Sequence, residues 1–136
     1  MSSRVRTFLD SGVLLAAVRS LGRDRERALR ILEDPNRVFL TSPFVQLELV
    51  PKAILHKKRL EKAFYDEYFN AAEWCREFHK IEDLAQIEAA RLGLAAMDAL
   101  HLAAAHLLRA DEFITTERPE KPICRSLLVD ILYLFE

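Results

Sequence analysis

The chain has 136 residues, of which 51% are hydrophobic, and this is enough to build one domain (residues 1–136) with a single core. No apolar run approaches the roughly 20 residues that cross a bilayer, and the N-terminus lacks a signal-peptide pattern, so we expect a cytoplasmic protein with no membrane contact. The net charge of −1 argues against general binding to polyanions. However, residues 1–62 carry 13 basic and 7 acidic side chains, a net charge of +6, whereas residues 63–136 carry 7 and 14, a net charge of −7. This asymmetry permits a basic surface beside an acidic site.

The chain begins with a strand-like pattern followed by two helix-like patterns. Residues 5–9 form a short apolar run, and "SGVLLAAV" after them suits a helix packed on a sheet. "GRDRERALRILED" predicts a second helix, which ends at the turn signal "DPN". Its arginines alternate with Asp24 and Glu26, so we expect local ion pairs. These arginines are Arg23, Arg25, Arg27 and Arg30.

A second strand and helix follow this turn. Residues 38–40 are β-prone, and Ser42 and Pro43 suit the N-cap and the first position of a helix. Pro51 lies inside the helical pattern and lacks the backbone N–H that a helix needs. We therefore expect a kink or a break near residues 49–50.

The second half of the chain continues the alternation. "KRLEKAFYDEYFN" predicts a helix, and residues 73–75 a brief strand. "IEDLAQIEAARLG" predicts a helix ending at Gly93, and "DALHLAAAHLLRA" a buried helix. Residues 112–115 and the closing "SLLVDILYLF" suit strands. Strands that alternate with helices predict an α/β fold, with a parallel sheet and helices on both faces.

Acidic residues recur where the predicted strands end or helices begin. Asp10 ends the first strand, and Glu48 lies in the first two turns of the helix after the second strand. Asp98 begins the buried helix, and Glu117 follows the strand at residues 112–115. In a parallel sheet, strand C-termini and helix N-termini share one edge. We therefore expect these four carboxylates to converge at that edge.

Converging carboxylates indicate a metal site, because they repel one another unless a cation compensates their charge. Hard oxygen ligands favour Mg²⁺ or Mn²⁺, which also bind phosphate oxygens of a substrate. Such ions lower the pKa of a bound water for in-line attack. The pattern therefore predicts metal-dependent hydrolysis of a phosphodiester.

Each acid also has a simpler interpretation. Asp10 and Asp98 suit helix caps, and Glu117 in "TTERP" suits a solvated turn. Glu48 is harder to explain in this way, because it lies among apolar residues and needs a partner. His101, three residues after Asp98 on the same helical face, can contact substrate or a group that supports the metal ligands, but a surface or packing histidine is the simpler interpretation. The predicted site depends on the four acids together.

Four segments of the chain together resemble the PIN domain family: "FLDSGVLLAA", "TSPFVQLELV", "AAMDALHLAAAH" and "DEFITTERPEK". This family of small metal-dependent ribonucleases includes the toxins of many prokaryotic toxin–antitoxin pairs. The resemblance implies that Asp10, Glu48 and Asp98 are catalytic metal ligands, with Glu117 at a place where the family often has Asp. It also implies a three-layer α/β/α sandwich with five parallel strands, and Mg²⁺ or Mn²⁺ as cofactor.

The resemblance further implies the substrate and the partners. These are RNA, hydrolysed to leave a 5′-phosphate, a second copy of the chain in a homodimer, and a small antitoxin protein. Gly12 departs from the family, which frequently has Asn or another polar residue there. That departure concerns the activity rather than the fold.

Hydroxyl and basic side chains are candidates for binding the substrate. The hydroxyls of Ser11, Thr115 and Thr116 lie beside the predicted carboxylates in the sequence. A basic cluster after Glu48 suits an RNA backbone, or else a solvated helix face. Its members are Lys52, His56, Lys57, Lys58, Arg59 and Lys62, of which we expect Lys52, Lys57 and Arg59 to contact RNA.

The pattern leaves three classes of function. The first is a metal-dependent endoribonuclease, a class that includes toxins. The second is a scaffold of the same fold that binds RNA or a protein, its catalytic site weakened by Gly12 and Glu117. The third is a phospho-acceptor receiver domain, but the chain has a lone Asp10 where receivers need an acidic pair, and no Lys in "SLLVDILYLFE". The ribonuclease is therefore the favoured hypothesis.

Overall fold

The computed structural model describes residues 4–135, which build one five-stranded sheet. All strand pairs are parallel, and the order is β3-β2-β1-β4-β5. The chain therefore winds outward from β1 to β3 and then returns to β4 on the other side of β1. In open α/β sheets, ligand sites lie outside the strand C-termini where the order reverses, here between β1 and β4. The strands are β1 (Val5–Leu9), β2 (Arg37–Thr41), β3 (Glu73–Trp74), β4 (Glu112–Thr115) and β5 (Asp130–Tyr133).

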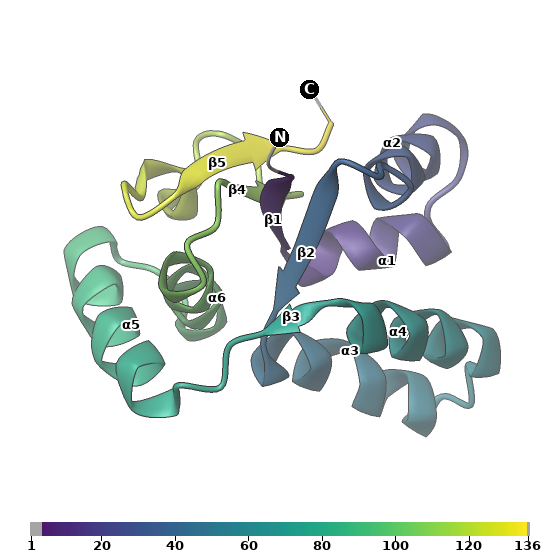
Figure 1. Cartoon of the computed structure of the whole chain (residues 1–136), viewed down its shortest axis with the longest axis horizontal. Coiled ribbons are helices and arrows are strands. Elements are labelled where there is room, and N and C mark those ends of the chain that lie inside the picture. Colours follow the sequence, from purple (N-terminus) through teal and green to yellow (C-terminus); the bar gives the residue numbers. More distant parts are fainter. Residues whose placement is uncertain (1–3, 136) are drawn as a thin grey trace.

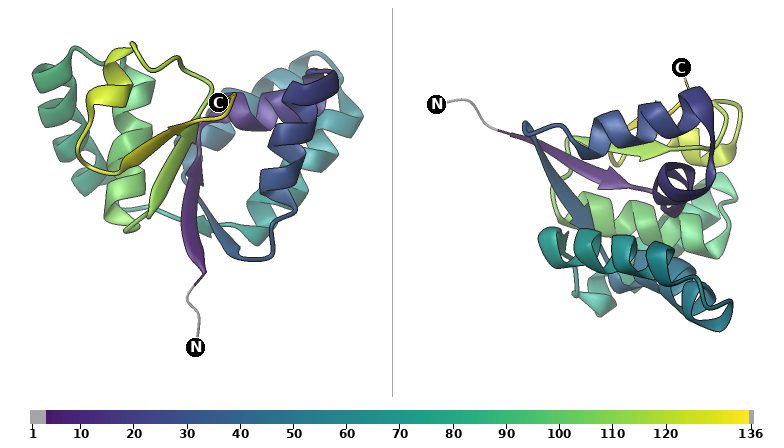
Figure 2. Two further views of the ribbon diagram at one scale, coloured as in Figure 1. Left: turned by 90° about the horizontal axis from the view of Figure 1, so that it is seen from above. Right: turned by 90° about the vertical axis from the view of Figure 1, so that its right-hand side faces the viewer.

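Helices cover both faces of this sheet (Figures 1 and 2). One face carries α1 (Ser11–Arg19), α2 (Gly22–Leu32), α3 (Pro43–Leu55) and α4 (Arg59–Ala71). The other carries α5 (Phe78–Leu92) and α6 (Ala96–Leu107), with the short 3-10 helix η1 (Pro122–Arg125) beside α5. The change of face follows from the reversal of strand order, because crossover connections are right-handed. The expected three-layer α/β/α sandwich with five parallel strands is thus confirmed.

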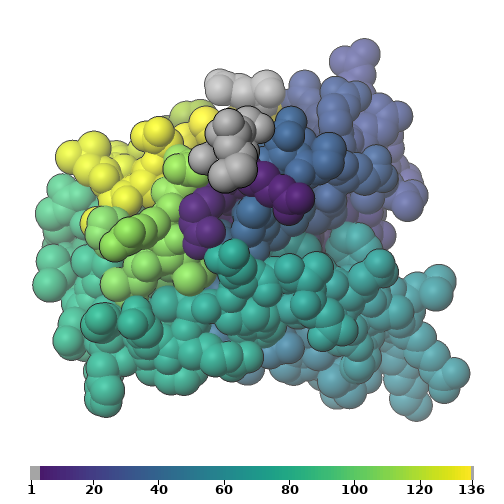
Figure 3. All heavy atoms as spheres, viewed as in Figure 1, coloured from purple at the N-terminus to yellow at the C-terminus, as the bar shows by residue number. Residues whose placement is uncertain are grey.

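Buried apolar side chains hold the layers together. Phe8 of β1 and Phe113 of β4 are fully buried and stack with their ring centroids 5.4 Å apart. On α6, Leu102 and a run of alanines are buried, and these small residues let the helix lie close to the sheet. On the face shown in Figure 3, α4 and α5 form the lower part, and the start of β1 lies above them.

Two of the predicted helix ends are confirmed in detail. The hydroxyl of Ser42 accepts a hydrogen bond from the backbone N–H of Phe44 at 3.2 Å, with Pro43 as the first residue of α3. Gly93 follows α5 with a φ of 72°, in the left-handed region that glycine adopts without strain. The first cap fixes where α3 begins, and the second fixes where α5 ends.

Of the kink or break expected near residues 49–50, the break does not occur, because α3 runs unbroken from Pro43 to Leu55. The ring of Pro51 lies on the exposed side of the helix, while Leu49 and Ala53 on either side of it are buried. Packing of both halves of α3 therefore holds the helix together across the one missing N–H.

The expected ion pairs of the α2 arginines are also wrong. Within residues 4–135, Arg23, Arg25, Arg27 and Arg30 form no ion pair. Exposed pairs gain too little energy to hold two long side chains in place.

No helix in this part of the chain is both long and apolar enough to cross a membrane.

Candidate active site

Asp10 lies at the junction of β1 and α1, and hydrogen bonds hold its side chain. It occupies the N-cap position of α1, but its carboxylate makes no capping bond. Instead, Oδ2 accepts a hydrogen bond from Thr115 Oγ1 at 2.9 Å, and Ser11 Oγ lies 3.5 Å from Oδ1. Thr115 is fully buried, and its hydroxyl also accepts the backbone N–H of Glu117 at 3.0 Å. Asp10 thus has the expected N-cap position, but the end of β4 and not the helix backbone orients its carboxylate.

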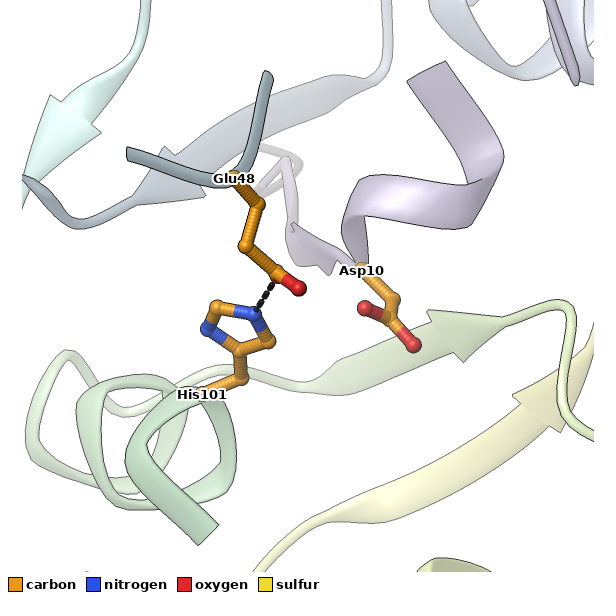
Figure 4. A group of neighbouring side chains, drawn as sticks. All are labelled: Asp10, Glu48 and His101. Carbon is orange, nitrogen blue, oxygen red and sulfur yellow. Dashed lines mark hydrogen bonds and ion pairs between the residues drawn. The ribbon is translucent and has the colours of Figure 1, made fainter. Parts of the chain in front are cut away.

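Glu48 of α3 reaches toward α6, where it meets His101 (Figure 4). His101 Nε2 lies 2.5 Å from Glu48 Oε1, and the histidine side chain is only 1% exposed. This hydrogen bond lowers the pKa of Glu48 below its usual range, and the hydroxyl of Ser11 and the charge of Lys52 add to the effect. An ionised carboxylate can only accept, so Nε2 carries the hydrogen. The expectation that Glu48 needs a polar partner is therefore met by His101.

His101 completes a cluster with the two carboxylates. One ligand atom each of Asp10, Glu48 and His101 can be chosen so that all three lie within 4.8 Å of one another. The surface interpretation of His101 is therefore wrong, and packing alone does not describe it. The signal was its spacing of three residues from Asp98, which places both residues on one side of α6.

Asp98 and Glu117 extend the cluster toward η1. Asp98 is the third residue of α6, and the N-cap of this helix is Ala95, so the capping interpretation of Asp98 is wrong. Burial raises the pKa of Asp98 to about 6, helped by the negative charges of Asp10, Glu117 and, more weakly, Glu48. Asp98 thus lies close enough to the other three predicted carboxylates for their charges to act on it.

The donor set fits a hard divalent cation. Carboxylate oxygens dominate it. Burial and, after it, the charges of Asp10 and Glu117 disfavour the ionised form of Asp98, and a bound cation relieves both effects. A pocket of about 270 Å³ lies beside Asp98 and Glu117 and is also lined by Lys121. Sequence reasoning missed Lys121, because nothing distinguishes it from other charges in its Pro-containing loop.

The other predicted binding residues fall in two places. Ser11, Thr115 and Thr116 lie at the carboxylates, and the Thr116 side chain packs against Gly12. Lys52 is near enough for its charge to act on Glu48. In contrast, Lys57 and Arg59 lie at the α3–α4 corner, where they line a hollow of about 310 Å³ that none of the four carboxylates lines.

Solved structures share this fold at low sequence identity. VapBC2 from Rickettsia felis, bound to a DNA fragment from its promoter, gives a TM-score of 0.70 at 16% identity, over 95% of this chain and 98% of that chain. A toxin–antitoxin complex from Klebsiella pneumoniae gives 0.71 at 20% identity, over 96% and 98%. FitAcB from Neisseria gonorrhoeae gives 0.65 at 18% identity, over 96% and 99%.

Comparison with curated protein sequences gives no match. The family model of the PIN domain, however, matches residues 7–118, which include Asp10, Glu48, Asp98 and Glu117. This match spans most of the 136 residues, from β1 to the loop after β4. The chain belongs to the PIN domain family.

Proposed function

We propose that this chain is a metal-dependent endoribonuclease that hydrolyses RNA phosphodiester bonds and acts as the toxin of a toxin–antitoxin pair. The observation that carries the proposal is the convergence of Asp10, Glu48, Asp98 and Glu117 from four separate segments at one sheet edge. Membership of a family whose members are generally nucleases supports it.

Asp10, Glu48 and Asp98 are the residues that would hold Mg²⁺ or Mn²⁺, with Glu117 at the outer side. When bound, the metal supplies an activated water and neutralises charge on the phosphate. Thr115 holds the carboxylate of Asp10 in place, and His101 does the same for Glu48. Both supporting side chains are buried, so they fix the ligands without occupying the space of the substrate.

Basic side chains near the site fit an RNA backbone. Lys52 lies one helical turn beyond Glu48, and Lys57 and Arg59 continue in the same direction at the α3–α4 corner. Lys58 and Lys62 line the same hollow. We assign these residues to phosphate contacts, which supply the part of RNA affinity that does not depend on base sequence.

The proposal includes an antitoxin partner, a homodimer and a cytoplasmic location. A toxin–antitoxin complex among the structures of the same fold supports the partner. Co-expression with a small protein encoded directly beside this chain, followed by purification of a complex, tests it.

The deciding experiment combines RNA cleavage with Mn²⁺ binding. Purified protein is incubated with a mixed-sequence single-stranded RNA and Mg²⁺ or Mn²⁺, with EDTA and with Asp10→Asn as comparisons. We expect metal-dependent cutting by the wild type and its loss in the variant, while isothermal titration shows Mn²⁺ binding only to the wild type.

A matched control removes a carboxylate outside the cluster. Asp24→Asn removes, like Asp10→Asn, one carboxylate near the start of a helix, here in the first turn of α2, and this variant should cut RNA normally. If the wild type neither cuts RNA nor binds Mn²⁺, the nuclease proposal fails, and a scaffold that binds RNA or a protein becomes the better description.

A further inference from the structure

A groove rich in arginine lies away from the carboxylates, between α2 and the chain after β5. It has a volume of about 630 Å³. Three arginines, one carboxylate and two apolar residues line it: Arg27, Arg30, Arg37, Asp34, Ile31 and Leu134. A hollow of about 260 Å³ adjoins it, lined by Arg23, Arg27 and Arg30 together with Glu26. We call the two together the arginine groove.

The arginine groove carries uncompensated positive charge. Arg37 is neutralised by Asp34 at 3.0 Å and by Glu112 at 2.9 Å. Arg27 and Arg30 have no ion-pair partner within residues 4–135. The groove therefore offers at least two guanidinium groups that no described carboxylate occupies.

The spacing of these groups suits a chain of phosphates. Arg23, Arg27 and Arg30 follow one another at intervals of four and three residues, so they share one face of α2 and rise by about 6 Å per four residues. A guanidinium presents a planar fork that binds phosphate oxygens bidentately. Arg25 lies on the opposite side of α2 and lines neither hollow.

Leu134, which lines the arginine groove, is hydrogen-bonded to the strand that supports the carboxylate site. The backbone N–H of Leu134 donates to the carbonyl of Thr115 at 2.8 Å, and the hydroxyl of Thr115 donates to Asp10. In Figure 1 the chain after β5 runs toward α2. The backbone of Leu134 at the groove and the side chain that holds Asp10 are thus joined through Thr115.

We propose that the arginine groove binds phosphates of single-stranded RNA. That the ligand is RNA rests on the nuclease function proposed above. The binding itself does not require the metal. An acidic protein segment is the competing occupant, and the experiment separates the two.

The test measures binding of the full chain to a fluorescein-labelled single-stranded RNA by anisotropy, in EDTA, so that no cleavage occurs. The variant is the double substitution Arg27→Gln and Arg30→Gln. Its matched control, Arg25→Gln with Arg109→Gln, also removes two positive charges, but neither residue lines the groove. Circular dichroism confirms that both variants fold.

We expect about a tenfold weaker affinity for the groove variant and a salt dependence shallower by about 1.4 in log Kd against log salt, the value for two lost phosphate contacts on a single strand. The control should retain the wild-type salt dependence more closely. Equal affinities and equal salt slopes for the wild type and the groove variant would overturn the proposal. So would a polyglutamate peptide that binds through Arg27 and Arg30 while RNA binding stays unchanged.

Cleavage measured separately in Mn²⁺ distinguishes the two proposals. If the protein binds RNA through the arginine groove but does not cut it, the proposed binding is supported and the proposed nuclease activity is contradicted. If the wild type cuts RNA and the groove variant binds RNA as tightly as the wild type, the nuclease activity is supported and RNA binding by the groove is contradicted.

Discussion

Gly12 and Thr116 share one space at the edge of the carboxylate site. A Cβ added at position 12 would lie 2.2 Å from Thr116 Oγ1 and 3.3 Å from Thr116 Cβ. Gly12 therefore lets the residue after β4 lie directly against the first turn of α1. A polar side chain such as Asn at position 12 would require Thr116 to move, so the two positions have to change together.

Substitution of Gly12 by Ala should destabilise the protein by about 1–2 kcal/mol, as overpacking of a close contact does. Thr116→Ala removes the two nearest atoms, so Gly12→Ala should be much less harmful in that background. Urea unfolding of the wild type, both single variants and the double variant measures this coupling. If Gly12→Ala lowers stability equally with Thr or Ala at position 116, the contact is not the cause.

Loss of the Thr115 hydroxyl should weaken metal binding. Thr115→Val keeps the shape but leaves Asp10 Oδ2 and the Glu117 N–H without their partner. We expect roughly tenfold lower Mn²⁺ affinity, as for other groups that orient metal ligands. Thr115→Ser should restore most of it.

Thr41 provides the control for this substitution. It is equally buried, on β2, but its hydroxyl has no hydrogen-bond partner in the described part of the chain. Thr41→Val should therefore leave Mn²⁺ affinity and stability unchanged or slightly improved. Calorimetric titration of Thr115→Val, Thr115→Ser and Thr41→Val measures their Mn²⁺ affinities, and urea unfolding measures their stabilities. Equal Mn²⁺ affinities for Thr115→Val and Thr41→Val would contradict the orienting role of Thr115.

The fold and the location of the site were predictable because both depend on local patterns. Short β-prone runs, the Ser42–Pro43 start and the Gly93 stop define elements whose alternation permits few topologies. In a parallel sheet this topology alone brings Asp10, Glu48, Asp98 and Glu117 to one edge.

Features that depend on packing between distant segments were not predictable. His101 contacts Glu48, which is 53 residues earlier, and no local pattern encodes that distance. The continuity of α3 through Pro51 likewise depends on burial of Leu49 and Ala53 against other elements. The role of Gly12 became visible only with the side chain of Thr116 in place.

His101 should be needed to keep Glu48 ready to bind a metal. His101→Phe keeps a buried ring but removes the donor, so the pKa of Glu48 should rise from its lowered value and Mn²⁺ affinity should fall several-fold. His101→Gln retains an N–H donor and should bind Mn²⁺ more tightly than the Phe variant. Titration of Mn²⁺ at pH 7 checks the order of the three proteins; wild-type affinity in His101→Phe would contradict it.

Substitution of Pro51 by Ala should stabilise the protein. Pro51 is exposed inside α3, so Ala restores a helical N–H without disturbing the core. The full helix propensity difference is about 3 kcal/mol, and we expect about 1–2 kcal/mol because the surrounding packing already accommodates proline. Urea unfolding measures the gain, with the neighbouring Lys52→Ala as a control that should change stability by less than about 0.5 kcal/mol. A loss of stability would mean that the proline ring makes a contact that α3 needs.

Asp98→Asn should stabilise the metal-free protein at neutral pH but not in acid. The pKa of Asp98 is about 6 in the folded chain and near 3.8 when the group is free of the fold. Because the folded state holds its proton more tightly, its stability falls as pH rises from about 4 to 6, and the loss persists above pH 6. A shift of this size corresponds to roughly 3 kcal/mol, which partial exposure reduces to about 1 kcal/mol.

Urea unfolding of Asp98→Asn in EDTA at pH 4 and pH 7.5 should show a gain in stability only at the higher pH. Asp24→Asn, at the matching position of α2, should instead lose a few tenths of a kcal/mol at pH 7.5, because it gives up a favourable interaction with the helix dipole. If Asp98→Asn loses stability at pH 7.5 as Asp24→Asn does, neither burial nor the neighbouring carboxylates destabilise the charged form of Asp98.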